Sequence, residues 1–146
     1  MRKVMVAFRM AGEAGRGKLS GLYRYISEHE PWNLRIIESA DEMTPEIVSG
    51  ALKDNYDGFI ISLPNADDDI SALAKTDVPT VVMDIHNHPL CERRNNIAFI
   101  RNSSEEIGRT AANHLLAIGK CRSYAFVHNP SVMQWSVDRC KAFRET

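Results

Sequence analysis

Short apolar runs alternate with stretches of helical length along most of the chain, and this alternation is the strongest constraint on its fold. Six runs are typical of β-strands: Val4–Phe8, Asn33–Glu38, Gly58–Leu63, Thr80–Ile85, Ile97–Ile100 and Ser123–His128. Helical patterns lie between them at 17–30, 44–54, 67–76 and 104–119, and a last helix begins near residue 132. Because strands separated by helices pair in parallel, the sequence predicts an α/β fold with a doubly wound parallel sheet.

The helix expected over 104–119 has recognisable ends. Ser103 and Glu106 have the spacing of a capping box, in which a serine side chain accepts a hydrogen bond from the first turn. Gly119 follows the last apolar residue and belongs to the residue type that most readily adopts a left-handed backbone. These two signals predict the bounds of the helix.

The predicted fold indicates where a ligand would bind. In doubly wound sheets, loops and helix N-termini converge at the carboxyl ends of the strands, and ligands bind there. Four segments follow strand ends in this way: Phe8–Gly17, Ser62–Asn65, Asp84–His88 and His128–Met133.

Composition excludes several classes of partner. The 146 residues carry a net charge of −1, which offers no basic face for nucleic acid, so we do not expect this segment to bind DNA directly. The three cysteines form an odd set without a C-x-x-C spacing, as expected of reduced thiols. No run of eighteen apolar residues and no signal-peptide pattern occurs, so we expect a cytoplasmic protein without a membrane span.

The stretch "GEAGRGKLS" at 12–20 resembles a phosphate-binding loop. Gly12, Gly17 and Lys18 match G-x-x-x-x-G-K, and such glycines let backbone N–H groups surround phosphates. Leu19, however, stands where a hydroxyl should hold Mg²⁺. A turn that leads into a helix is the favoured interpretation, and a nucleotide-binding enzyme stays open as an alternative.

We find no sequence support for a metal or catalytic site. His86, His88 and Cys91 are ligand types, but no matching second pair follows them. No Ser/His/Asp or Cys/His arrangement has a supporting context. We therefore expect no metal, no cofactor and no enzymatic activity.

Trp135 and Arg139 lie four residues apart and so share one face of the last predicted helix. An aromatic plane beside a bidentate hydrogen-bond donor suits a sugar, which stacks through its C–H face and needs fixed partners for its hydroxyls. A core tryptophan with a surface arginine is the equally open alternative.

Three segments resemble the ligand-sensing core of the lactose-repressor family: "VPTVVMD" at 78–84, "EEIGRTAANHLLAIGKCRSYAFV" at 105–127 and "SVDRCKAF" at 136–143. The nearest likeness is to the AraC-type xylose regulators, through "GRGKLSGLYRYI" at 15–26 and "QWSVDRCKAF" at 134–143. The resemblance implies the periplasmic-binding-protein fold, with two α/β lobes around a ligand cleft. Residues 1–102 would form the first lobe, and residues 103–146 would begin the second.

The resemblance also implies roles for single residues. Ser62 and Asp84 fall where family members contact sugar hydroxyls from the first lobe, and Arg139 falls on the second-lobe arginine that reaches the ligand. Arg16 matches the subgroup's arginine after the first strand, and Trp135 adds a stacking surface.

The implied function is sugar sensing in a bacterial transcription regulator, with the DNA-binding part outside this chain. We expect a pentose or hexose ligand and a cytoplasmic homodimer. A secreted sugar-binding protein of the same fold is a second alternative beside the nucleotide-binding enzyme.

Overall fold

The computed structural model describes residues 1–38, 42–62, 71–84, 95–131 and 133–146. These residues form two compact units, Met1–Arg101 and Asn102–Thr146. The division lies one residue before the lobe boundary expected from the sequence. Each unit is described by itself below.

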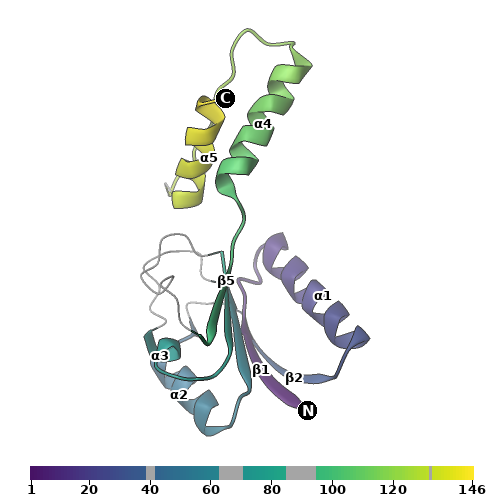
Figure 1. Cartoon of the computed structure of the whole chain (residues 1–146), viewed down its shortest axis with the longest axis vertical. Coiled ribbons are helices and arrows are strands. Elements are labelled where there is room, and N and C mark those ends of the chain that lie inside the picture. The colour runs from purple at the N-terminus through teal and green to yellow at the C-terminus, as the bar shows by residue number, and fades with distance from the viewer. Residues whose placement is uncertain (39–41, 63–70, 85–94, 132) are drawn as a thin grey trace. The chain divides into compact units, whose positions relative to one another are not determined.

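A five-stranded parallel sheet forms the centre of the first unit (Figure 1). Its strands are β1 (Arg2–Ala7), β2 (Trp32–Ile37), β3 (Gly58–Ser62), β4 (Thr80–Met83) and β5 (Ile97–Ile100). They lie in the order β2-β1-β3-β4-β5, and every neighbouring pair is parallel. This confirms the α/β fold class. Strand β2 is added on one side of β1 and strands β3 to β5 on the other, so the strand order reverses between β1 and β3.

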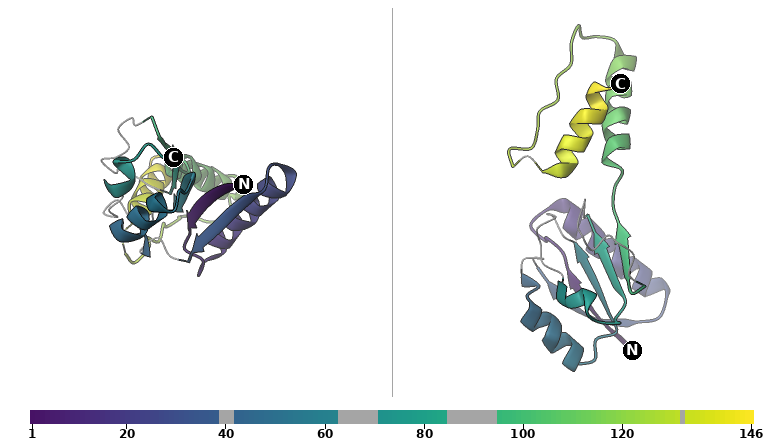
Figure 2. Two further views of the ribbon diagram at one scale, coloured as in Figure 1. Left: turned by 90° about the horizontal axis from the view of Figure 1, so that it is seen from below. Right: turned by 60° about the vertical axis from the view of Figure 1, so that its left-hand side comes forward.

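Helices cover both faces of this sheet, as Figures 1 and 2 show. Helix α1 (Glu13–Glu28) lies on one face, where Leu19 and Leu22 pack beside Val6 and Phe8. Helices α2 (Pro45–Lys53) and α3 (Ser71–Ala74) lie on the other. The sheet is therefore the middle of three layers, which explains why several of its strands are apolar throughout.

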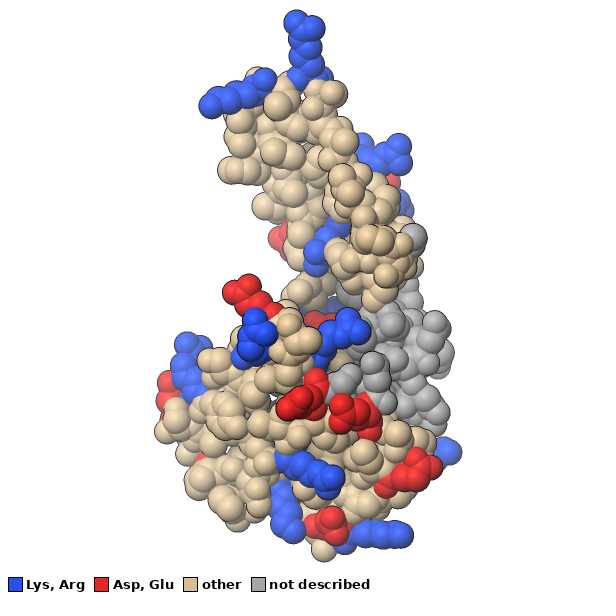
Figure 3. All heavy atoms as spheres, turned by 180° about the vertical axis from the view of Figure 1, so that it is seen from behind, with Lys and Arg blue, Asp and Glu red and all other residues tan. Residues whose placement is uncertain are grey.

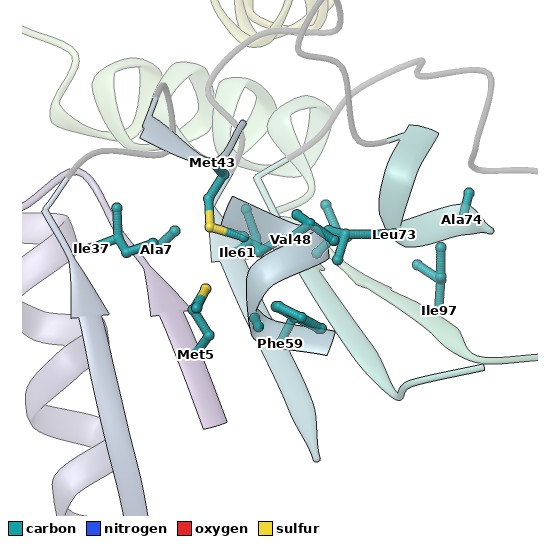
Figure 4. Packing of buried hydrophobic residues seen from close by; sticks show 12 residues of the cluster. Met5, Ala7, Ile37, Met43, Val48, Phe59, Ile61, Leu73, Ala74 and Ile97 are labelled. Atoms are coloured by element: carbon teal, nitrogen blue, oxygen red, sulfur yellow. The ribbon is translucent and has the colours of Figure 1, made fainter. Parts of the chain in front are cut away.

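The larger core lies between the sheet and the α2–α3 layer. Met5, Phe59, Ile61 and Leu73 are at most 1% exposed there, and they pack together from two strands and a helix (Figure 4). Each such side chain contributes roughly 1.5–3 kcal/mol on burial. This core also holds Ile61 of β3 and Val82 of β4, and the carboxyl ends of these two strands carry the site described below.

Helix α1 begins earlier than the sequence predicts. The expected range was 17–30, with the glycines before it in a turn, but the helix runs from Glu13. Gly15 lies inside this helix, and a Cβ there would lie 2.0 Å from the carbonyl oxygen of Arg9. The glycine thus serves a close approach between helix and loop rather than a turn.

The second unit is built on α4 (Ser104–Ile118) and α5 (Gln134–Arg144). Gly108 lets them touch, since a Cβ there would lie 2.2 Å from the carbonyl oxygen of Arg139. Both predicted ends of α4 are confirmed. Ser103 accepts a hydrogen bond from the backbone N–H of Glu106 at 3.2 Å, and Gly119 adopts a left-handed φ of 63°.

The strand predicted at Ser123–His128 does not form: no described residue pairs with this segment as a strand. Its aromatic and β-branched residues favour an extended backbone, but a strand also needs a neighbour that supplies hydrogen bonds. Val127 is consequently 88% exposed. The predicted helix 67–76 is described only as α3, because residues 63–70 lie outside the described ranges.

No helix within the described ranges has both the length and the apolar character that a membrane crossing requires. On the face shown in Figure 3, basic and acidic side chains of the first unit are interspersed rather than gathered into a patch of one sign. A mixed surface of this kind accords with the net charge of −1.

Candidate functional site

Three polar side chains meet at the carboxyl edge of the sheet, beside the reversal of strand order. Ser62 is the last residue of β3, Asp84 follows β4, and Lys18 comes from the second turn of α1. We call these three residues the edge cluster. It lies where ligands bind in doubly wound sheets.

The edge cluster is closed by three contacts. The Lys18 ammonium donates a hydrogen bond to Ser62 Oγ at 3.0 Å and forms an ion pair with Asp84 Oδ2. Ser62 Oγ donates to the same carboxylate oxygen. The Ser62 residue is only 7% exposed, whereas the side chains of Lys18 and Asp84 are 21% and 36% exposed. The cluster is therefore anchored in the core by the serine and open to solvent at its charged groups.

The backbone fixes the position of Asp84. Its φ is 63°, in the left-handed region, where aspartate and asparagine are the side-chain-bearing residues found most often. Its N–H donates to the carbonyl oxygen of Ile100 at 2.9 Å, which ties the residue to the end of β5. Unusual backbone conformations held in this way are concentrated at functional sites.

The remaining hydrogen-bonding capacity of the edge cluster matches a polyol. Asp84 Oδ1 accepts no hydrogen bond from any residue that the structure describes, and Lys18 uses two of its three N–H groups. An acceptor and a donor thus lie side by side, as two neighbouring sugar hydroxyls require. Both charged groups strengthen such bonds.

Lys18 is the member of the edge cluster that the sequence assigned to another chemistry. The phosphate-loop interpretation required residues 12–17 to wrap a phosphate, but residues 13–17 are helical, and the Arg16 N–H donates to the carbonyl oxygen of Gly12. Their N–H groups therefore do not form a loop. The available signal was positional. Lys18 comes after the first strand, Ser62 ends the third strand, and Asp84 directly follows the fourth.

Arg16 makes no hydrogen bond or ion pair with the edge cluster in the described part of the chain. Its Nη1 instead donates to the carbonyl oxygens of Met10 and Ala11 at 3.3 and 3.4 Å. The arginine thus closes the loop between β1 and α1. Its guanidinium is exposed and keeps further donors available to a ligand.

Trp135 and Arg139 come together within the second unit. The Arg139 guanidinium carbon lies 4.6 Å from the centre of the Trp135 ring, within the range of a cation–π interaction. Arg139 Nε is buried and has no hydrogen-bond partner among the described residues. Both side chains are partly buried, so the arrangement is intermediate between a core tryptophan with a surface arginine and a fully exposed binding pair.

The candidate metal ligands His86, His88 and Cys91 lie outside the described residues. Among the residues that are described, no three His, Cys, Asp or Glu side chains gather in a way that could hold a metal ion.

No family model and no curated protein matches the chain. Solved structures do. The trehalose repressor from Escherichia coli matches with a TM-score of 0.73 at 13% identity, over 98% of this chain and 53% of its own. A periplasmic binding protein/LacI transcriptional regulator from Alkaliphilus metalliredigens QYMF, complexed with D-xylulofuranose, matches with a TM-score of 0.70 at 17% identity, over 99% and 52%.

An ABC transporter solute binding protein from Agrobacterium vitis with bound D-fucose also matches, with a TM-score of 0.68 at 14% identity, over 99% of this chain and 52% of its own. At identities this low, these TM-scores show a shared fold alone. The chain therefore has the periplasmic-binding-protein-like fold found in sugar-binding regulators and transport proteins. It spans about half the length of these neighbours.

Proposed function

We propose that the chain is part of a sugar-sensing domain in a bacterial transcription regulator, without enzymatic activity and with its DNA-binding part outside these residues. The edge cluster carries this proposal, because it offers a sugar a carboxylate acceptor and an ammonium donor at the ligand-binding edge of a fold shared with sugar-binding proteins. The repressor and the LacI-type regulator among the structural neighbours support the regulatory assignment.

In this proposal Ser62, Asp84 and Lys18 of the first unit bind the sugar hydroxyls, with Arg16 at the loop after β1. Trp135 and Arg139 are the ligand-binding residues proposed for the second unit. The sugar stabilises a closed state of the sensor, and the difference in sugar affinity between the open and closed states changes the geometry of a cytoplasmic homodimer. The sequence likeness to xylose regulators makes a pentose the first ligand to test.

A solute-binding protein of a sugar transporter is the second candidate. The observation that favours it is the match to a transport protein with bound D-fucose, at a TM-score close to those of the regulators. The nucleotide-binding alternative has no such support, since most of the stretch that resembles a phosphate-binding loop is helical.

The test is thermal unfolding of the full-length protein against a panel of pentoses and hexoses, with ATP and Mg²⁺ as a separate arm. A ligand that binds only the native state raises the melting temperature by mass action. We expect one sugar to raise it, and Arg139→Ala to reduce the shift. A shift with ATP alone, lost in Lys18→Ala, contradicts the sugar assignment.

A second measurement separates regulator from transporter. The full-length protein is tested for retention of DNA fragments from its own chromosomal neighbourhood, with and without the sugar that raises its melting temperature. Sugar-dependent retention is expected of the regulator. Sugar binding without any DNA retention favours the solute-binding protein.

A further inference from the structure

We propose that Lys18 and Asp84 act together as a charge filter, which restricts the site to uncharged sugars and rejects both sugar acids and amino sugars. The inference deepens the proposed function and rests on it, because it concerns the ligand class of the same site. It assigns Lys18 a role in specificity that the sequence did not indicate.

The argument begins with how Lys18 is placed. Gly15, less than one turn before it, lets α1 approach the carbonyl oxygen of Arg9 more closely than any side chain would allow. This fixes the start of α1 against the loop that follows β1. Lys18 then reaches Ser62 and Asp84, which lie 44 and 66 residues further along the chain.

The second step is the charge balance. The ammonium and the carboxylate are in direct contact, and both also contact the buried hydroxyl of Ser62. The edge cluster therefore has no net charge while it keeps one free acceptor and one free donor. An uncharged diol can use both groups without breaking the ion pair.

A charged ligand has no such option. A sugar carboxylate can pair with Lys18 only while it lies against the Asp84 carboxylate, and an amino sugar meets the same conflict with Lys18. Like charges at contact oppose binding, and the partial exposure of both side chains moderates the penalty through solvent screening. We expect this conflict to weaken charged analogues by roughly tenfold.

The filter predicts opposite changes in two variants. Asp84→Asn removes the negative charge and leaves Lys18 unpaired, so the site should gain preference for sugar acids. Lys18→Met removes the positive charge with little change in length, so it should gain preference for amino sugars. Asparagine is the suitable replacement at position 84, because it tolerates the φ of 63° that alanine would adopt only with strain.

The experiment measures binding by the full-length protein with titration calorimetry. Three ligand series are built on D-xylose, D-glucose and D-galactose, each with the uncharged sugar, its sugar acid and its 2-amino derivative. Lys75→Met is the matched control, because Lys75 is an exposed lysine of the same unit and lies outside the edge cluster. Lys18→Gln repeats the test should the methionine variant fold poorly, which melting temperatures reveal.

We expect the wild type to prefer an uncharged sugar. The acid-to-neutral affinity ratio should rise roughly tenfold in Asp84→Asn and the amine-to-neutral ratio roughly tenfold in Lys18→Met, with no change in Lys75→Met. Ratios within twofold of wild type in both charge variants overturn the filter and leave the sugar site standing. A change in only one variant also overturns it, in favour of a single selective charge. No binding of any series by the wild type overturns the proposed function and the filter together.

Discussion

Replacing Gly15 by alanine tests whether the close approach of α1 to its preceding loop positions the site. A Cβ at this position would lie 2.0 Å from the carbonyl oxygen of Arg9 and 2.8 Å from its carbon, whereas real Cβ atoms essentially never come closer than 3.0 Å. The helix or the loop must therefore move by about 1 Å, and both contact atoms are backbone, which cannot rotate aside.

The expected cost combines two opposing effects. Alanine in a helix is favoured over glycine by about 1 kcal/mol, and forcing an extra carbon into a packed site costs about 3 kcal/mol where the backbone must shift. We therefore expect Gly15→Ala to lower the free energy of unfolding by about 2 kcal/mol, or a melting temperature lower by about 8 °C for a unit of this size.

The same helix supplies two matched controls. A Cβ at Gly17 or at Gly21 would meet nothing within 4 Å, so only the gain in helix propensity remains. Both Gly17→Ala and Gly21→Ala should raise the free energy of unfolding by roughly 0.5–1 kcal/mol. The three variants make the same substitution at different positions of one helix. The change in the free energy of unfolding should be negative for Gly15→Ala and positive for the other two.

The assay is thermal and urea unfolding of the three variants, followed by sugar binding. A shift of about 1 Å would stretch the 3.0 Å contact between Lys18 Nζ and Ser62 Oγ beyond hydrogen-bond length, so Gly15→Ala should also weaken binding. A Gly15→Ala protein as stable as Gly17→Ala would refute the close approach. A Gly15→Ala protein that is less stable than the wild type but binds sugar with the same affinity would refute the link to the site.

Two further predictions concern helix ends. Gly119→Ala should destabilise the protein by about 1 kcal/mol, measured by thermal unfolding, because alanine adopts the left-handed φ of 63° only with strain, and Gly119→Asn should cost less. The pKa of Glu46 lies below its ordinary value, because its carboxylate accepts a hydrogen bond from its own backbone N–H and a second one from the side chain of Thr44. The contribution of Glu46 to stability is therefore present above the unfolded-state pKa. It is lost as the pH falls through the lower folded-state pKa. Thr44→Ala should raise the pKa of Glu46 in a carboxyl NMR titration; an unchanged value would rule out the contact with Thr44.

The fold could be predicted largely from the sequence, because its signals are local. Apolar runs identified all five strands of the sheet to within two residues at either end, including Ile97–Ile100 without error. Capping chemistry gave both ends of α4, through Ser103 and Gly119. The order of the strands was not available in this way, since it depends on contacts between segments far apart in the chain.

The site could be predicted only in part. Ser62 and Asp84 follow from the rule that ligands bind at strand ends, and both belong to the edge cluster. Lys18 could not be placed, because a glycine-rich stretch before a lysine suggests a flexible loop. The stretch instead forms the first turns of α1, and the close approach at Gly15 is a tertiary contact that composition does not reveal.

The segment at Ser123–His128 shows that a strand predicted from local residue types also depends on contacts with other strands. Its pattern of aromatic and β-branched residues resembles that of β3, which lies hydrogen-bonded between β1 and β4. In the second unit no described strand lies beside the segment, and Val127 remains almost fully exposed. Strand propensity largely reflects packing against neighbouring strands. Similar residue types therefore form a strand where such neighbours exist and an unpaired extended segment where they do not. Lys18 obeys the same logic, since its chemistry is set by Ser62 and Asp84 rather than by the residues beside it in sequence.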